Sequence, residues 1–350
     1  MEATPEAPTE QKSEDAVDLT GLWIFIGIAA AILLLFVVLV LCLKLYYYCI
    51  KGVCRSPQQM NGKTVIITGG NAGIGKETAK ELARRKARVI IACRNVNKAQ
   101  EAADEIFRET QQTVVVKHLD LSSLKSVRDF ARDIVFTEQR LDVLINNAGM
   151  TQTDQLQLTE DGYELTFQTN YLGHFLLTML LLDLLKKTAP SRVVNVSSGL
   201  HHLGATDRME ERITGKLQSN PTLTYSHTKM ANLMFTIELA KRLKSKGVTV
   251  NALHPGLIKT AISDGLVGED LYFKLNFWIF GKTATEEAQT SIYLAVDPNI
   301  SGETGCYFSD CQKAWINWRA RNAQRTQELF ETSVKLAHLE ASEIHKLFET

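Results

Sequence analysis

The stretch "KTVIITGGNAGIG", Lys63 to Gly75, decides the fold. Its first half is a continuous apolar run with β-branched residues, which predicts a strand buried on both faces. Its second half places Gly69, Gly73 and Gly75 directly before a helical pattern. Glycine lets the backbone turn tightly and approach a ligand closely, and the N–H groups that open a helix bind phosphate. The stretch therefore predicts the first strand, turn and helix of a dinucleotide-binding βαβ unit.

Short strands alternate with helical patterns along the rest of the chain. After a helix at 75–87, strands are predicted at 88–94, 113–121, 141–149, 191–198 and 247–256. These runs are apolar throughout, as are strands of a parallel sheet with helices on both faces. We therefore predict a doubly wound α/β sheet in one domain over residues 63–335, with a C-terminal tail at 336–350.

The end of the second predicted strand distinguishes between two dinucleotides. Sites for NAD carry an acidic residue about 20 residues beyond the glycines, where it binds the ribose 2′-hydroxyl. Here the strand ends "IACRN", with Arg94 in that region and Lys98 after it. A guanidinium binds a 2′-phosphate through two hydrogen bonds, whereas a carboxylate would repel it. The sequence favours NADP(H), and the alternative is that Arg94 is simply a solvated strand end.

The N-terminal part of the chain predicts a membrane anchor. Residues 1–20 are polar and acidic and are expected to be disordered, whereas Gly21 to Leu43 contain no charge. A helix over residues 21–43 would reach about 34 Å, enough to cross a bilayer core. A cleaved signal peptide fits poorly, because the run is too long and follows acidic residues. Residues 44–62 are expected to form a linker.

Charge around the span predicts its orientation. Acidic residues dominate before the span, whereas Lys44, Lys51, Arg55 and Lys63 follow it. Because the positive flank of a span stays in the cytosol, we predict a single-pass protein whose large C-terminal domain faces the cytosol.

Composition excludes several classes of partner and site. Lys+Arg and Asp+Glu both number 39, so net charge gives no argument for nucleic-acid binding. The six cysteines lack metal-ligand or redox spacing and are expected to be reduced thiols. No metal site is predicted, because His201 and His202 have no carboxylate or cysteine at ligand spacing.

Six motifs resemble those of short-chain dehydrogenases/reductases and occur in the order typical of that family. They are "TGGNAGIG", "NNAG" (146–149), "TNYLGHF" (169–175), "VNVSS" (194–198), "YSHTK" (225–229) and "HPGLIKT" (254–260). The resemblance covers roughly residues 60–335. Within the family, "ACRN", "SSGLHHLG", "YFSDC" and the stretch 319–339 are similar to the membrane-anchored retinol dehydrogenases. This resemblance implies a Rossmann fold, NADP(H), a retinoid-like lipophilic alcohol or aldehyde and, by analogy, the endoplasmic reticulum.

The resemblance also implies four catalytic residues. Tyr225 would be the general acid/base, and Lys229, four residues later on the same helical face, would bind the cofactor ribose. The Lys229 ammonium and the positive nicotinamide are expected to lower the tyrosine pKa from about 10. Ser198, rather than Ser197, would bind the reacting oxygen of the substrate, and Asn170 would support a water-linked proton relay. The alternative for each is a polar residue that caps a strand or helix.

The cofactor site is expected to combine the glycine-rich turn with the ends of later strands. The residues at 147–149 would line the ribose, those at 120–121 the adenine, and those at 255–260 the nicotinamide. The complete set is Gly69, Gly70, Asn71, Ala72, Gly73, Ile74, Gly75, Arg94, Asp120, Leu121, Asn147, Ala148, Gly149, Tyr225, Lys229, Pro255, Gly256, Ile258 and Thr260.

Two segments are expected beside the substrate. Residues 201–223 separate Ser198 from Tyr225 by more residues than in short family members and are interpreted as a surface excursion. Residues 261–288 are rich in aromatics and predict either a lid over an apolar substrate or plain core packing. The substrate is expected to be retinol/retinaldehyde, and a steroid, farnesal or a fatty aldehyde is the alternative. A non-catalytic scaffold is the rival function, and the sequence does not indicate the oligomeric state.

Overall fold

The structure is a computed structural model that describes residues 20–151, 155–258 and 281–349. The chain divides into two compact units, Met1–Cys49 and Ile50–Thr350. Residues 1–19 of the predicted disordered N-terminus (1–20) and most of the predicted lid (261–288) lie outside the described residues, whereas Thr20 begins a helix.

The first unit consists of helix α1 (Thr20–Ile50). Its mean hydropathy reaches 3.3, and it is the one helix in the described ranges that is long and apolar enough to cross a membrane. The helix contains the predicted span, Gly21 to Leu43, and continues through the tyrosines at 46–48. Part of the predicted linker is therefore helical.

The second unit is built on an eight-stranded sheet in the order β10-β9-β6-β5-β4-β1-β2-β3. Its strands are β1 (Thr64–Thr68), β2 (Arg88–Cys93), β3 (Val115–His118), β4 (Val143–Asn146), β5 (Ser191–Val196), β6 (Val248–His254), β9 (Tyr307–Ser309) and β10 (Gln312–Lys313). Every pair is parallel except β9 with β10. The run β3-β2-β1-β4-β5-β6 is the strand order of dinucleotide-binding sheets, so the predicted doubly wound fold is confirmed. A separate parallel pair joins β7 (Leu257–Ile258) to β8 (Gly281–Lys282).

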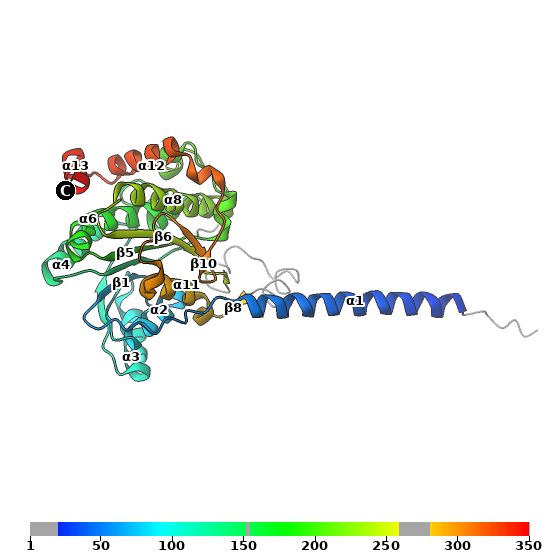
Figure 1. The fold of residues 1–350 in the computed structure, drawn as a ribbon. Helices are drawn as coiled ribbons and strands as arrows, with labels where there is room; N and C mark the ends of the chain where they lie inside the picture. The colour runs from blue at the N-terminus through cyan, green and yellow to red at the C-terminus, as the bar shows by residue number, and fades with distance from the viewer. Residues whose placement is uncertain (1–19, 152–154, 259–280, 350) are drawn as a thin grey trace, which may run out of the picture. The chain divides into compact units, whose positions relative to one another are not determined.

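Helices cover both faces of this sheet (Figure 1). On one face lie α2 (Gly73–Arg84), α3 (Val96–Thr110) and α11 (Ala284–Val296). On the other face lie α4 (Leu124–Thr137), α6 (Gly173–Thr188) and α8 (Pro221–Arg242). Two C-terminal helices, α12 (Ala323–Leu336) and α13 (Ala341–Glu349), form an outer layer over α6 and α8. Ile344 of α13 is buried, so the segment predicted as a tail contains a packed helix.

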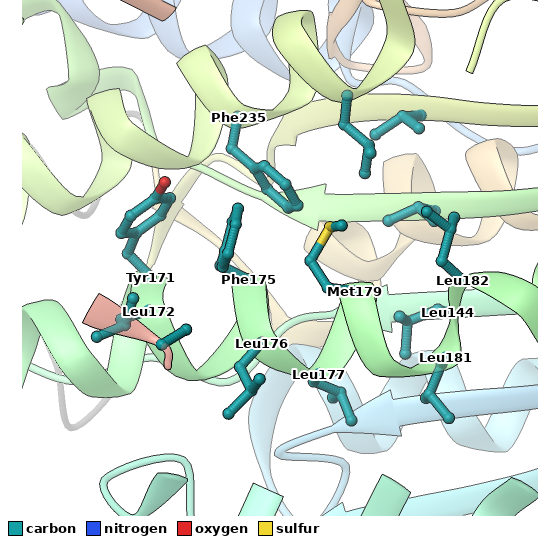
Figure 2. Packing of buried hydrophobic residues seen from close by; sticks show 14 of the residues in the cluster. Leu144, Tyr171, Leu172, Phe175, Leu176, Leu177, Met179, Leu181, Leu182 and Phe235 are labelled. Atoms are coloured by element: carbon teal, nitrogen blue, oxygen red, sulfur yellow. The ribbon is translucent and has the colours of Figure 1, made fainter. Parts of the chain in front are cut away.

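The larger core surrounds α6, whose sequence is apolar on nearly every side (Figure 2). Phe175 of this helix lies 5.1 Å from Phe235 of α8 and 5.3 Å from Phe330 of α12, measured between ring centroids. A helix that is hydrophobic all round must be covered on all sides. Here the sheet covers one side, and α4, α8 and α12 cover the others.

One predicted strand is wrong in its extent and burial, and two short strands were not predicted. The strand predicted at 113–121 is shortened to Val115–His118, and its residues are half-buried or exposed, because β3 is an edge strand with only β2 beside it. The sequence analysis also missed β9 and β10, which hold three and two residues and are too short to show a periodicity.

The predicted surface excursion at 201–223 is partly core. It includes most of the 3₁₀ turn η2 (Gly199–Leu203), helix α7 (Met209–Ile213) and the start of α8. His201, Met209 and Ile213 are buried, and the two aliphatic residues join the core beneath α8 and α12. Isolated apolar residues in a polar stretch anchor it to the domain.

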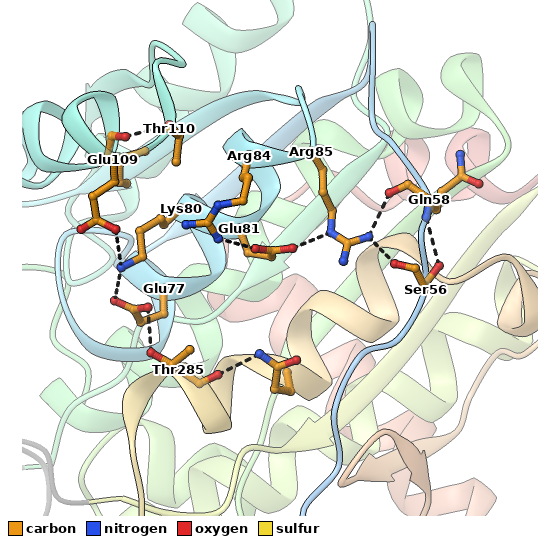
Figure 3. Close-up of polar contacts among 12 residues, drawn as sticks. Ser56, Gln58, Glu77, Lys80, Glu81, Arg84, Arg85, Glu109, Thr110 and Thr285 are labelled. Carbon is orange, nitrogen blue, oxygen red and sulfur yellow. Dashed lines mark hydrogen bonds and ion pairs between the residues drawn. The ribbon is translucent and has the colours of Figure 1, made fainter.

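A polar network holds α2 against its neighbours (Figure 3). The Lys80 ammonium lies 3.0 Å from Glu77 and 3.2 Å from Glu109 of α3. The Thr285 hydroxyl of α11 donates to Glu77 at 2.9 Å. Because α2 is tied to the helices on either side of it, its N-terminus is held at a fixed place above the sheet.

The segment between α1 and β1 is bound along the second unit, and we call residues 51–60 the strap. The Arg85 guanidinium donates to the carbonyl oxygens of Ser56 and Gln58 at 2.6 and 2.9 Å (Figure 3). The N–H of Gly52 donates to Asp310 at 2.9 Å. The strap buries Cys54 and Met60. It is thus part of the folded domain.

Candidate active site

The glycine-rich turn joins β1 to α2 and has the conformation that only glycine adopts easily. Gly69 and Gly73 have φ of +66° and +53°. A Cβ on Gly75 would lie 2.5 Å from both the Asn147 amide nitrogen and the Gly69 carbonyl oxygen. Helix α2 begins with Ala72 as its N-cap residue. Alanine has no side-chain oxygen to accept from the first turn, so the N–H groups there are available to a phosphate.

This turn forms one wall of a cleft of about 620 Å³ at the carboxyl ends of the central strands. Most of the predicted cofactor residues line it: Gly69, Asn71, Ala72, Gly73, Ile74, Gly75, Arg94, Asp120, Leu121, Asn147, Ala148, Gly149, Tyr225, Lys229 and Pro255. Gly70, Asn170, Ser198, Gly256 and Ile258 are not among the lining residues, and Thr260 lies outside the described residues. Ligands bind at this edge of an open α/β sheet, where the strand order reverses.

Gly70 supports the turn from below. A Cβ there would lie 2.9 Å from the Ile91 side chain of β2. Its contribution is therefore close packing of the turn on the neighbouring strand.

Arg94 lies at the end of β2, is exposed and lines the cleft. Asn95 follows it and caps α3, because its side-chain oxygen accepts from the Lys98 N–H at 3.0 Å. Arg94 therefore brings a positive charge to the cleft that the glycine turn also lines.

Tyr225 and Lys229 lie one turn apart on α8, and both are buried. The Lys229 Nζ is 5.3 Å from the centre of the tyrosine ring and donates to the Val196 carbonyl oxygen at 2.9 Å. The Ser198 side chain lies near enough to the phenol of Tyr225 to lower its pKa, and its hydroxyl accepts from the Leu200 N–H at 3.2 Å. The adjacent Ser197 has a different orientation and donates to the Lys229 carbonyl at 2.8 Å. Of the two serines, Ser198 is the one that acts on the phenol of Tyr225.

Burial controls the protonation of this pair. It raises the pKa of Tyr225 to about 12, and the bond from Ser198 counteracts this only in part. It lowers the pKa of Lys229 to about 8. The rise follows from the enclosure of the phenol, and the expected lowering by Lys229 together with the positive nicotinamide stays a prediction for the cofactor-bound site. At neutral pH the phenol keeps its proton, as a general acid must.

Asn170 occupies a single π-helical turn, η1 (Gln168–Leu172), between α5 (Leu165–Phe167) and α6. Its side chain accepts from the Met150 N–H at 2.8 Å and donates to the Met150 carbonyl at 2.8 Å. It also donates to Thr228 of α8 at 3.2 Å. A Cβ built on Gly149 would lie 3.5 Å from Lys229 Nζ and 3.6 Å from the Asn170 side-chain oxygen. Asn170 therefore holds the loop beside Lys229.

Thr68 and His174 complete the support of the site and were missed by the sequence analysis. The Thr68 hydroxyl accepts from the N–H groups of Asn147 and Ala148 at 2.9 and 3.0 Å. It lies 2.8 Å from His174 Nε2, and His174 Nδ1 donates to the Asn170 carbonyl at 3.1 Å. Burial lowers the pKa of His174 to about 4, so the ring is neutral and Nε2 accepts the threonine proton. The histidine four residues after Asn170 was the available signal.

Other cleft residues were also missed by the sequence analysis. They are Ala92, Cys93, Asn95, Leu119, Met150, Thr169, Val196, Ser197 and Ala284. Most adjoin a predicted residue, so extending each motif by one position would have found them.

Comparison with known proteins identifies the family. The family model for short chain dehydrogenases matches residues 63–268. Retinol dehydrogenase 12 of Bos taurus is 48% identical over 286 residues, which cover 81% of this chain and 89% of the relative. A crystal structure of an uncharacterised protein from Mycobacterium paratuberculosis has a TM-score of 0.66 and 34% identity, and covers 83% of this chain and 98% of that one. A short chain dehydrogenase from Shigella flexneri complexed with NADP has a TM-score of 0.59 and 25% identity, covering 73% and 100% of the two chains. The glycine turn, the Tyr225–Lys229 pair and these similarities lead to one conclusion: the chain belongs to the short-chain dehydrogenases, oxidoreductases acting on CH–OH groups, and within them to the retinol dehydrogenase group.

Proposed function

We propose that the protein is a membrane-anchored, NADP(H)-dependent oxidoreductase that interconverts retinol and retinaldehyde and acts mainly as a reductase. The observation that carries this proposal is that the buried Tyr225 and Lys229 lie one turn apart on α8 and both line the cleft that begins at the glycine turn. The relative named Retinol dehydrogenase 12 supports a retinoid-like substrate.

The residues present fit a dinucleotide phosphate. A Cβ on Gly75 would collide with Asn147 and Gly69, so the close turn beneath a phosphate requires glycine at this position. The free N–H groups of the first turn of α2 suit the pyrophosphate. Arg94 would hold the 2′-phosphate, and Lys229 the nicotinamide ribose. The NADP complex of the Shigella flexneri protein supports the same choice. When bound, NADPH supplies the hydride that reduces a carbonyl carbon.

The side chains of the chain divide the remaining work. Ser198 would donate a hydrogen bond to the substrate oxygen and orient it. Tyr225 would then donate its phenolic proton to that oxygen as negative charge develops on it. The Lys229 ammonium would stabilise the phenolate that remains, because both groups lie in the same buried pocket.

The orientation of the protein in the membrane determines whether reduction or oxidation of the substrate is favoured. We propose that α1 spans the membrane of the endoplasmic reticulum and that the second unit faces the cytosol, because the positive residues follow the span. The cytosolic NADP pool is largely reduced, so the site would run mainly as a carbonyl reductase. A steroid, farnesal or a fatty aldehyde remains the alternative substrate.

The test is turnover by the full chain in nanodiscs, followed by NADPH absorbance with all-trans-retinaldehyde, farnesal, a fatty aldehyde and a ketosteroid. We expect retinaldehyde to give the highest kcat/KM and Tyr225→Phe to abolish turnover while NADPH still binds. A faster reaction with another carbonyl would replace the retinoid assignment. NADPH binding without turnover of any carbonyl would instead support a scaffold.

A further inference from the structure

Three large apolar side chains are exposed close to η2, and we call them the aromatic patch: Leu203, Trp315 and Trp318. Their exposed fractions are 57%, 73% and 71%. Trp315 and Trp318 belong to the segment that leads from β10 into α12. Tryptophan has a large apolar area, and exposing that area to water is unfavourable. Two exposed indoles three positions apart therefore indicate a contact with a membrane or with another molecule.

The patch is held in place by the domain. The His202 ring stacks on Trp315 with 5.3 Å between ring centroids and 13° between planes. The Asn317 side chain donates to the His202 carbonyl at 3.1 Å. Between the two indoles, Ile316 is buried and anchors the segment. The indoles are therefore presented outward by a fixed backbone.

The residues around the patch match the chemistry of a lipid headgroup layer. The Arg319 guanidinium carbon lies 5.9 Å from the Trp318 ring centroid, and Arg321 is exposed two residues later. Tryptophan favours the membrane interface because one end of its ring is apolar and the other donates a hydrogen bond, and arginine pairs with lipid phosphates. The proposed span at α1 would hold the same chain at a bilayer.

Hydrogen bonds also connect the patch to Ser198, which is expected to bind the substrate oxygen. His201 Nδ1 donates to the Ser198 carbonyl at 2.7 Å, and His201 Nε2 accepts from the Asn317 N–H at 3.4 Å. The His201 ring therefore joins the segment that bears the indoles to Ser198, the residue predicted to bind the substrate oxygen. A surface contact at the patch would place lipid against the segment that His201 links to Ser198.

We propose that the aromatic patch is a second membrane contact, which rests on the headgroup layer of the bilayer and admits the lipophilic substrate to Ser198 directly from lipid. The inference rests on the proposed membrane anchoring through α1. It adds a surface whose partner is a phospholipid bilayer, whereas a protein partner would not require lipid for the contact.

Tryptophan quenching in nanodiscs tests this contact without turnover. The chain has four tryptophans, and Trp23→Phe with Trp278→Phe leaves those of the patch. In nanodiscs of brominated phosphatidylcholine we expect the emission of this variant to fall severalfold below that in unbrominated lipid. A chain with Trp23 alone checks the anchor separately. Quenching of Trp23 without quenching of the patch would overturn the inference and leave the proposed anchoring intact.

Phe136 provides the matched control. It is 90% exposed on α4 and lies outside the patch. Phe136→Trp, as the sole tryptophan, should show no quenching by brominated lipid. Equal quenching at both places would show that lipid contact is not specific to the patch and would refute the proposal.

Kinetics give a second readout. Trp315→Ser with Trp318→Ser should raise the KM for retinaldehyde dissolved in nanodiscs severalfold. The same variant should keep its NADPH affinity and its kcat/KM for a short water-soluble aldehyde. Phe136→Ser should alter neither value. A fall in the short-aldehyde rate, or an unchanged KM for retinaldehyde, would refute entry from lipid at this surface.

Discussion

Glu287 should make the stability of the domain fall as pH rises. This residue lies on α11, is 0% exposed, and has no hydrogen-bond partner for either carboxylate oxygen among the described residues. The buried hydroxyls of Ser291, one turn later, and of Thr78 on α2 are likewise unpartnered there. The two helices pack on each other. The interface behind the glycine turn therefore contains a carboxyl group that accepts no hydrogen bond from the described residues, and the positive charge of Lys282 offsets its burial only in part.

Burial raises the pKa of Glu287 from 4.5 to about 8. Between these values the folded protein keeps a proton that the unfolded chain has released. Because the unfolded state then binds fewer protons, unfolding becomes more favourable as pH rises. The gap of about 3.5 pH units corresponds to at most about 5 kcal/mol, reached above pH 8 and absent below about pH 4.5.

Glu287→Gln keeps the shape and removes the charge. Urea unfolding in detergent, followed by fluorescence at pH 5 and pH 8, should show a variant more stable than the wild type at pH 8 by several kcal/mol, and by much less at pH 5. Glu331→Gln on the exposed face of α12 is the control and should change neither value. An equal difference at both pH values would refute the reasoning, because it would show that the Glu287 carboxylate is solvated in the folded state.

Three further outcomes test the site and the topology. Arg94→Asp should raise the KM for NADPH far more than that for NADH, and equal shifts would show that Arg94 does not bind the 2′-phosphate. Gly75→Ala should weaken NADPH binding at least tenfold, because its Cβ would lie 2.5 Å from Gly69 O. Titration of protein fluorescence measures this, and unchanged binding would show that the glycine turn does not hold the phosphates. Asn299 is exposed in an Asn-Ile-Ser sequon and should carry no glycan. An endoglycosidase-sensitive mass shift that disappears in Asn299→Gln would reverse the orientation.

The alternation of strands and helices in the central sheet was predictable from sequence. The glycine turn and the apolar runs at 88–94, 141–149 and 191–198 each carry a local signal, and they became neighbouring strands in the expected order. The extent and burial of strand β3 were misjudged, because a short apolar run does not reveal that its strand lies at the edge of the sheet. The apolar residues Met209 and Ile213 were misjudged because a polar stretch surrounds them.

The candidate site was predictable only where its chemistry lies in motifs. The sequence predicted Tyr225 and Lys229 through the family resemblance and Arg94 from the missing acid at the end of its strand, and the structure brings all three to one cleft. The bonds from Thr68 to His174 and from Asn170 to Met150 join residues separated by 106 and 20 positions. No local pattern reports such pairs, and the same is true of the tyrosine pKa, which burial controls.

The strap has a practical consequence for making a soluble fragment. The family model begins at residue 63, which suggests that position as a starting point for expression. A chain cut there would leave the Arg85 guanidinium without its two carbonyl acceptors and Asp310 without the Gly52 N–H. It would also expose the apolar surface that Cys54 and Met60 cover. A truncation that removes α1 should therefore begin at Lys51, so that crystallisation and solution work start from an intact domain.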